Sequence, residues 1–160
     1  MPVTLSKQHQ RIASFLKANH IGILATADKT GTPQAAAMYY ALDDELNIYF
    51  ITKKGTAKGR NLEQNPLVAF TVYEAASQST LQVSGTAQQL DDVSAFQRIF
   101  KTILVASRIT SDSPVPPVTR LNSGEYVAYK IKPQTMRLAQ YTKPDKGDFE
   151  NIFTTTSSPD

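Results

Sequence analysis

A strand that runs into a short basic helix is the stretch of this sequence best equipped for chemistry. Residues 48–51 are β-branched or aromatic, which predicts a strand. Thr56 is a suitable helix N-cap, and a short helix is expected from Ala57 to Gln64, where Asn65 and Pro66 end it. The free N–H groups and the dipole of a helix start attract anions.

The side chains around this turn suit a phosphate group. Thr56 offers a hydroxyl, and cations are available from Lys53, Lys54, Lys58 and Arg60. Capped helices beside basic turns also occur without any ligand. From the residues alone, a phosphate site and a solvated basic turn are therefore both open.

The composition is that of one globular domain without cysteine chemistry. The chain has 160 residues, 41% of them hydrophobic, 19% charged, and a net charge of +3. The absence of cysteine excludes disulfides and thiolate chemistry. Lys and Arg form no dense run, so no nucleic-acid partner is expected, and the sequence has neither a long apolar run nor a signal core. We therefore expect a cytoplasmic protein without a membrane partner.

Metal binding is not expected, because the chain has only two histidines and nothing in the sequence brings them together. His9 and His20 are interpreted as surface or helix-end residues. The sequence also shows no nucleophile and base in a recognisable arrangement, so no catalytic residue is assigned.

The pattern of apolar residues predicts three helices and six or seven strands. The helices are expected at Val3–Asn19, Ala57–Gln64 and Val93–Ser107, the last capped by Asp91 or Asp92. The strands are expected at Ile21–Ala27, Gln34–Leu42, Leu46–Thr52, Leu67–Tyr73, Thr80–Leu90, Glu125–Lys132 and, after a break at Pro133, Thr135–Tyr141. The first three strands should form a meander, and Gly85 should mark a bulge or a close approach.

Strands joined by tight turns predict a mainly β (α+β) fold, in which an antiparallel sheet closes as a barrel with flanking helices. Residues 1–142 should form this domain, with the N-terminal helix as part of it. Residues 143–160 are polar and rich in turn formers, and we expect a loosely ordered tail. The apolar residues of the long helix should be core or interface.

The ordered set of motifs resembles the FMN-binding split β-barrels of the pyridoxamine-phosphate oxidase-like family, and its general-stress-protein branch most of all. The core pattern is carried by Thr52, Thr56, Lys58, Leu62, Asn65 and Pro66. It is flanked by the segments Gly31–Ala36 and Val83–Ala87.

The resemblance implies an antiparallel split barrel that forms a homodimer with two FMN sites at the subunit interface. Thr52 would bind the phosphate or the ribityl chain of the flavin, and Thr56 and Lys58 would hold the phosphate, with Lys53 as a further cation. Ile51 and the backbone of Ala37 and Met38 would line the isoalloxazine ring, and Gln82 would reach its pyrimidine edge.

Two departures from the family pattern bear on activity. Family oxidases carry arginines about where this chain has Ala35 or Ala36, and Ala57. The C-terminal signature that handles pyridoxal phosphate is missing, so pyridoxamine-phosphate oxidase activity is not predicted.

The expected function is therefore an FMN-binding protein and flavin-dependent oxidoreductase whose substrate is unknown. A flat apolar molecule near Tyr39 or Tyr40 would suit the apolar surroundings of the ring. The alternative is a non-catalytic dimeric flavin- or ligand-binding stress protein on the same fold. A deazaflavin, haem or no cofactor at all are further alternatives.

Overall fold

The computed structural model describes residues 6–112, 115–120, 124–141 and 153–157 of the 160-residue chain. Its helices are α1 (Lys7–Ala18), α2 (Ala57–Gln64) and α3 (Val93–Thr110), with a 3-10 turn, η1, at Pro117–Arg120. Its strands are β1 (Ile21–Ala27), β2 (Pro33–Tyr39), β3 (Ala41–Leu42), β4 (Ile48–Lys53), β5 (Leu67–Glu74), β6 (Ser79–Leu90), β7 (Tyr126–Gln140) and β8 (Phe153–Ser157).

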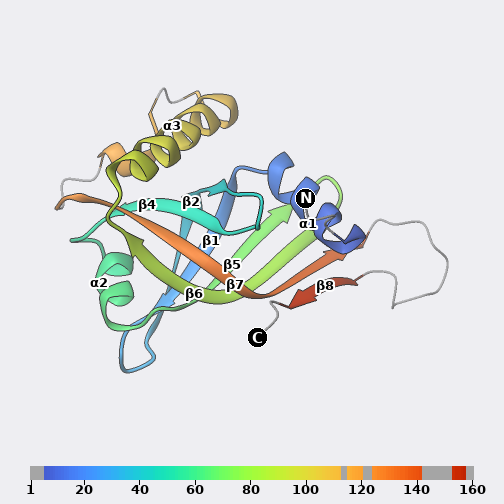
Figure 1. The fold of residues 1–160 in the computed structure, drawn as a ribbon, viewed down its shortest axis with the longest axis horizontal. Helices are drawn as coiled ribbons and strands as arrows, with labels where there is room; N and C mark the ends of the chain where they lie inside the picture. Colours follow the sequence, from blue (N-terminus) through green and yellow to red (C-terminus); the bar gives the residue numbers. More distant parts are fainter. Residues whose placement is uncertain (1–5, 113–114, 121–123, 142–152, 158–160) are drawn as a thin grey trace.

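The strands form one antiparallel sheet in the order β2-β1-β5-β6-β7-β4-β3, and β8 adds to β7. The sheet is strongly curled, and β2 and β4 come close to each other without forming a ladder (Figure 1). The fold is thus a split barrel, and the predicted mainly β, antiparallel class with flanking helices is confirmed. The split between β2 and β4 is the place where the site described below is found.

Alternating burial along the strands fills the interior of the barrel. The largest fully buried side chains include Leu24, Phe50, Phe70, Leu81, Ile131 and Leu138. Helix α2 packs beside β1 at the end of β4, α3 lies along β2 and β4, and α1 lies near β8 (Figure 1). The two helices that border the split are therefore α2 and α3.

The predicted meander of the first three strands is only partly confirmed, because the expected second strand pairs with the first through β2 but with the third only through the two residues of β3. Strand β2 pairs with β1, whereas β4 pairs with β3 and β7 at the opposite end of the sheet. The expected second strand is interrupted at Tyr40, whose side chain is buried and whose backbone N–H donates to His20 O at 3.3 Å. The chain thus leaves β2 for the far edge of the sheet instead of returning alongside it.

Pro133 does not break the last long strand, contrary to expectation. On one side of β7, the pairing with β4 ends at Ile131 and that with β8 begins at Thr135, so Pro133 needs no donor there. On the other side, the ladder with β6 shifts register between Ser84 and Gly85. The irregularity predicted at Gly85 is confirmed, and a Cβ there would collide with the carbonyl oxygen of Lys132.

The tail expected to be loose contains a strand, because β8 at Phe153–Ser157 pairs with residues 135–139 of β7. The expectation is therefore wrong for these five residues, and the rest of 143–160 lies outside the described residues. None of the helices in the described part of the chain is long and apolar enough to cross a membrane.

Candidate cofactor site

A pocket of about 320 Å³ lies in the split of the barrel. It is bordered by β2, β4, the start of α2, the middle of α3 and the turn η1. The residues that line it are Ile21, Ala37, Met38, Tyr39, Ile51, Thr52, Lys58, Ile103, Pro116, Pro117 and Val118. Five of the eight residues predicted to bind the cofactor are thus brought together around one cavity: Ala37, Met38, Ile51, Thr52 and Lys58.

Helix α2 begins as its sequence predicts and is held firmly at this end of the pocket. The Thr56 hydroxyl accepts from Gly59 N at 3.2 Å, which is the expected N-cap bond. A Cβ on Gly59 would lie 2.7 Å from the carbonyl oxygen of Lys53, so only glycine lets the helix approach the end of β4 this closely. The Asn61 amide donates to the Thr26 hydroxyl of β1 at 3.0 Å and ties the helix to the sheet.

A chain of hydroxyl groups connects the pocket to the helix cap. The Thr56 hydroxyl donates to Lys53 O at 2.7 Å, and it lies 3.1 Å from the hydroxyl of Thr52. Because the Thr56 proton is already engaged, Thr52 is the donor between the two threonines. The fully buried Thr52 therefore offers the pocket an oxygen lone pair.

Lys58 is the cation of the pocket. Its side chain is partly buried at the start of α2, and desolvation by burial lowers its pKa below the ordinary value of 10.5. It has no hydrogen-bond or ion-pair partner among the described residues. A half-buried cation without a counter-charge is costly for the fold, so this end of the pocket suits an anion.

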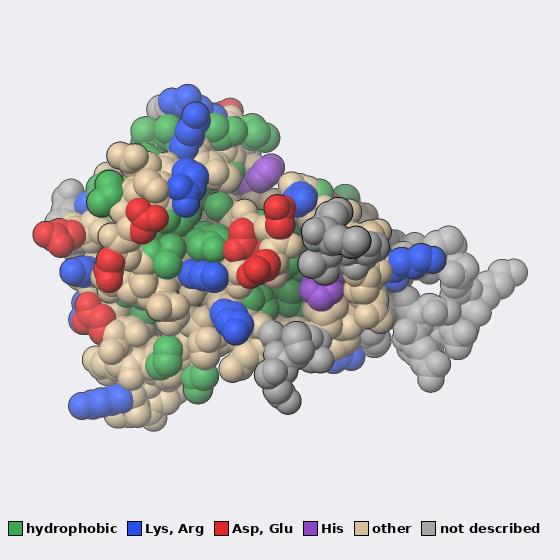
Figure 2. All heavy atoms as spheres, viewed as in Figure 1, with side chains coloured by type: hydrophobic (Ala, Val, Ile, Leu, Met, Phe, Trp, Pro, Cys, Tyr) green, Lys and Arg blue, Asp and Glu red, His purple; other side chains and the backbone are tan. Residues whose placement is uncertain are grey.

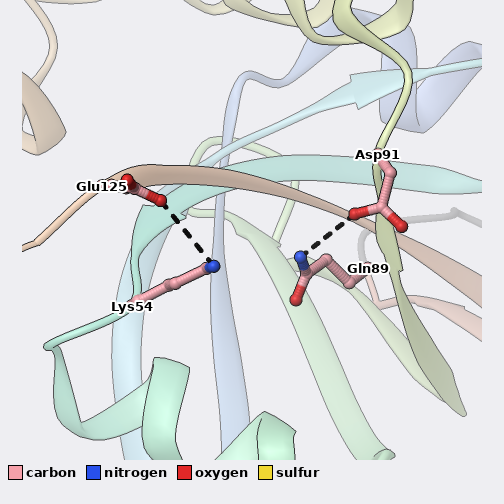
Figure 3. Close-up of polar contacts among 4 residues, drawn as sticks. All are labelled: Lys54, Gln89, Asp91 and Glu125. Atoms are coloured by element: carbon pink, nitrogen blue, oxygen red, sulfur yellow. Dashed lines mark hydrogen bonds and ion pairs between the residues drawn. The ribbon is translucent and has the colours of Figure 1, made fainter.

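The other basic residues of the turn are engaged elsewhere. Lys53 Nζ lies 4.7 Å from the ring centroid of Tyr126. Lys54 extends toward Glu125 at the start of β7, with 3.8 Å between Nζ and Oε2 (Figure 3). Arg60 donates to Gly55 O at 2.7 Å. Of the four cations that the sequence placed near the helix start, Lys58 alone is a lining residue.

Three of the predicted cofactor residues do not line the pocket. Thr56 acts as the cap behind Thr52, and Lys53 lies against Tyr126. Gln82 is exposed on the outer face of β6, where the register places it between Thr71 and Arg137. Strands β5 and β1 separate it from β2 in the sheet.

The wall of the pocket that faces away from α2 is apolar. Ile51 and Ile103 belong to one hydrophobic cluster of buried residues, and Tyr39 and Val118 pack against it. The Tyr39 hydroxyl bonds with that of Thr110 at 2.9 Å, and the Thr110 hydroxyl donates to Ala106 O. Because the single hydroxyl proton of Thr110 is already donated to Ala106 O, the Tyr39 hydroxyl is the donor of the bond between them, and its proton is directed toward α3.

Sequence reasoning missed most of this wall. Ile103 is expected only among the core or interface residues of the long helix, and the sequence indicates no binding role for Pro116, Pro117 or Val118. Periodicity on α3 shows which residues are buried but not which cavity they border. The consecutive prolines before Val118 were the available signal, because they fix the backbone of a segment.

The two tyrosines differ in position. Tyr39 lines the pocket, whereas Tyr40 is buried in the core, and its hydroxyl proton is shared between the carbonyl oxygens of Leu16 at 2.7 Å and Asn19 at 2.9 Å. Burial raises the pKa of Tyr40 well above its ordinary range. The expectation that a ligand might stack on Tyr40 is therefore wrong.

The profile of the pyridoxamine 5'-phosphate oxidase family matches residues 8–140, and the chain belongs to this family. The chain is similar to the dihydrophenazinedicarboxylate synthase of Pseudomonas chlororaphis, with 29% identity over 86 residues. That match covers 49% of this chain and 39% of the relative, so the chain aligns with well under half of the relative's length.

Solved structures share the fold at low sequence identity. General stress protein 26 from Bacillus anthracis superposes with a TM-score of 0.62 at 21% identity, over 83% of this chain and 94% of that one. A pyridoxamine 5'-phosphate oxidase-related, FMN-binding protein from Nostoc punctiforme superposes with a TM-score of 0.61 at 15% identity, over 99% of this chain and all of that one. The general-stress-protein fold indicated by the sequence is thus among those that match.

Proposed function

We propose that this protein binds FMN in the pocket between β2 and β4 and acts as a flavin-dependent oxidoreductase. The observation that carries the proposal is Lys58, a half-buried cation without a partner among the described residues, at the start of a helix. The FMN-binding relative of the same fold supports it. A cytoplasmic location is part of the same proposal.

The residues present fit the phosphate end of FMN. The backbone N–H groups of Ala57 and Lys58 have no partner among the described residues, and Gly59 N is already capped by Thr56. These two donors and the Lys58 cation together suit a phosphate. The lone pair that Thr52 turns toward the pocket suits a hydroxyl donor, so of the two roles expected for Thr52 the ribityl chain is favoured.

The rest of the pocket would bind a ring by apolar contact. Ala37, Met38 and Ile51 lie on the two strands that border the split, and none of them carries a charge. FMN would supply the redox chemistry when bound, while these residues orient the ring and exclude water from it. Neither histidine lines this pocket, which argues against haem ligation by histidine here.

The proposal can be tested by titrating the purified protein with FMN and recording its absorbance spectrum. Bound flavin should appear, and Lys58→Glu should weaken binding roughly 100-fold by removing a charge-assisted contact and adding repulsion. Lys54→Glu is the matched control, because its exposed ion pair contributes little and it does not line the pocket. Unchanged FMN affinity in Lys58→Glu would falsify the site, and a Soret band would favour haem instead.

A second candidate function is flavin binding without turnover. Among the described residues that line the pocket, Lys58 and Tyr39 are the only ones with an ionisable side chain, and the Tyr39 hydroxyl is directed toward Thr110. The pocket therefore offers a substrate little acid–base help. If protein-bound reduced flavin is reoxidised no faster by a panel of quinones and aromatic acceptors than by dissolved oxygen, this candidate replaces the oxidoreductase.

The proposal includes a homodimer with two sites at its interface. The outer face of the sheet exposes the large apolar side chains of Ile21, Ile23 and Tyr73, beside Ala35 and Ala37 of β2. Helix α3 adds hydrophobic side chains at the surface, as Figure 2 shows, among them Val105 and Ile109. Exposed apolar patches of this kind mark interaction surfaces.

Gln82 gives the dimer a role in the site. It lies on the same outer face, in register with Thr71, which in turn pairs with Ile23. Because it does not reach the pocket of its own subunit, contact with a flavin would have to come from the partner.

Sedimentation tests the dimer. The wild type should sediment as a dimer at micromolar concentration, and Ile23→Asp should sediment as a monomer with reduced FMN affinity, while Val93→Asp on the exposed start of α3 remains dimeric. A stable wild-type monomer would refute the interface.

A further inference from the structure

The turn η1 holds the apolar wall of the pocket in place. The carbonyl oxygen of Pro116 accepts from Thr119 N at 3.1 Å and from the Thr119 hydroxyl at 2.7 Å, which closes this turn. Two consecutive prolines restrict the backbone further. Val118 packs on the cluster that contains Ile51 and Ile103. The position of the wall beside the pocket is therefore set by the turn and by this packing.

The side chains of this wall are all apolar. Ile103, Pro116, Pro117 and Val118 contribute no side-chain donor, acceptor or charge. The hydroxyl of Tyr39, which also lines the pocket, donates to Thr110 and is not free to donate to a ligand. A charged group placed here would lose its hydration without compensation.

We infer that this wall takes a second ligand of the site, a flat and uncharged aromatic molecule such as a naphthoquinone. A planar ring makes contact over its whole face with Ile103 and Val118, while its neutral edge needs no ionic partner. This molecule would be the partner of the proposed flavin, so that role rests on the proposed function, whereas its binding can be measured without FMN.

Val118 is the residue on which selectivity depends. It is only partly buried, so it can be replaced with less risk to the core than Ile103, which is almost fully buried. An acidic side chain at this position should repel a negatively charged ligand and bring water to the apolar wall. A basic side chain should attract the negatively charged ligand.

Equilibrium binding of 1,4-naphthoquinone and of its 2-sulfonate, followed by ligand-observed NMR on the full chain with and without added FMN, tests this selectivity. With FMN bound, so that its phosphate neutralises Lys58, the wild type should bind the neutral quinone at least about tenfold more tightly than the sulfonate. Without FMN, the same preference should appear in Lys58→Met, which lacks the pocket cation that would attract the sulfonate. Val118→Asp should lose about tenfold in quinone affinity, and Val118→Lys should reverse the preference toward the sulfonate. Val93→Asp and Val93→Lys, the same substitutions on an exposed residue outside the pocket, should leave both affinities unchanged.

The outcomes separate this ligand from the cofactor. FMN binding together with equal affinity for both quinones, or with no effect of the Val118 variants, overturns the inferred ligand class and leaves the cofactor proposal intact. Selective quinone binding that responds to Val118 supports the inferred ligand class, and it does so even if FMN does not bind and the cofactor proposal fails.

Discussion

The segments before and after strand β4 are both rich in polar side chains, but they differ in how far hydrogen bonds satisfy the charged groups. Before the strand, the Asp43 carboxylate accepts from Glu45 N at 3.0 Å, Asn47 N at 2.9 Å, the Asn47 amide at 2.8 Å and the Tyr49 hydroxyl at 2.7 Å. After the strand, the ammonium group of Lys58 has no such partner in the described part of the chain.

The pKa values of the two groups reflect the same contrast. Burial acts to raise the pKa of Asp43, but the hydrogen bonds from Asn47, Tyr49 and Glu45 outweigh it, so the net pKa is lowered and the charge is stabilised. Burial also lowers the pKa of Lys58, and no interaction opposes it, so the charge of that residue is destabilised by the fold.

The comparison separates a structural role from a binding role. The polar groups around Asp43 are accounted for by a turn in which Leu46, a buried residue, takes a positive φ of 64°. The cation of Lys58 is not accounted for by any contact of the described residues. A fold that carries an uncompensated charge gains stability from whatever neutralises it, which is the basis for placing an anionic ligand there.

The first prediction removes the Asp43 carboxylate, which accepts the hydrogen bonds of the turn before β4. Asp43→Ala should lower the free energy of unfolding by about 2–4 kcal/mol, because it leaves the hydroxyl of Tyr49 without its acceptor and the buried amide of Asn47 with only the longer bond to Glu45 Oε2 at 3.3 Å. Urea denaturation measures this change, and FMN affinity measured below the transition should remain that of the wild type.

Asp44→Ala is the control for this turn, because Asp44 is exposed and is adjacent to Asp43 in the chain. It should change the free energy of unfolding by about 0.5 kcal/mol or less. Equal effects of the two substitutions would mean that the carboxylate network does not hold the turn.

The second prediction removes the charge of Lys58 and expects a gain in the free energy of unfolding, where the first expects a loss. Lys58→Met keeps the length of the side chain but removes the uncompensated charge, so the protein without ligand should gain about 1 kcal/mol or less. Its thermal midpoint should rise by about 2–4 °C per kcal/mol, while FMN binding weakens. A loss of stability in Lys58→Met would show that an unseen partner already neutralises Lys58.

The β4–α2 connection could be predicted from the sequence because its determinants are local. The cap at Thr56 and the helix at Ala57–Gln64 match expectation because capping involves residues three apart in the chain. The same holds for β1 and for the Asp92 cap of α3. The sequence does not show which lysine lines the pocket, because Lys53 and Lys54 contact residues far away in the chain, namely Tyr126 of β7 and Glu125 just before it.

The other half of the site depends on long-range packing and could not be read from the sequence. Ile103 and Val118 reach the pocket only because α3 and η1 pack against β4. The paths of β2 and β4 to opposite ends of the sheet were likewise hidden, since the residues between them also suit tight hairpins. Local signals thus give the basic end of the pocket and leave its apolar wall undetermined.

The smallest effect is a pair of opposite pH dependences that both originate at Lys58. The unfolded chain holds the lysine proton up to its ordinary pKa of 10.5, whereas the folded protein releases it at lower pH. Between the lowered pKa and 10.5 the unfolded state therefore binds more protons, and the stability of the ligand-free protein should rise with pH through this window. A phosphate beside Lys58 favours the charged form, so FMN binding should take up a proton in this window and FMN affinity should fall as pH rises.

Thermal melts without ligand and FMN titrations, both between about pH 7.5 and 10.5, measure the two slopes. Subtracting the same curves for Lys58→Met removes every other group that titrates there. Equal slopes of FMN affinity in wild type and variant would place the phosphate away from Lys58, and equal slopes of ligand-free stability would mean that the fold does not lower the pKa of Lys58.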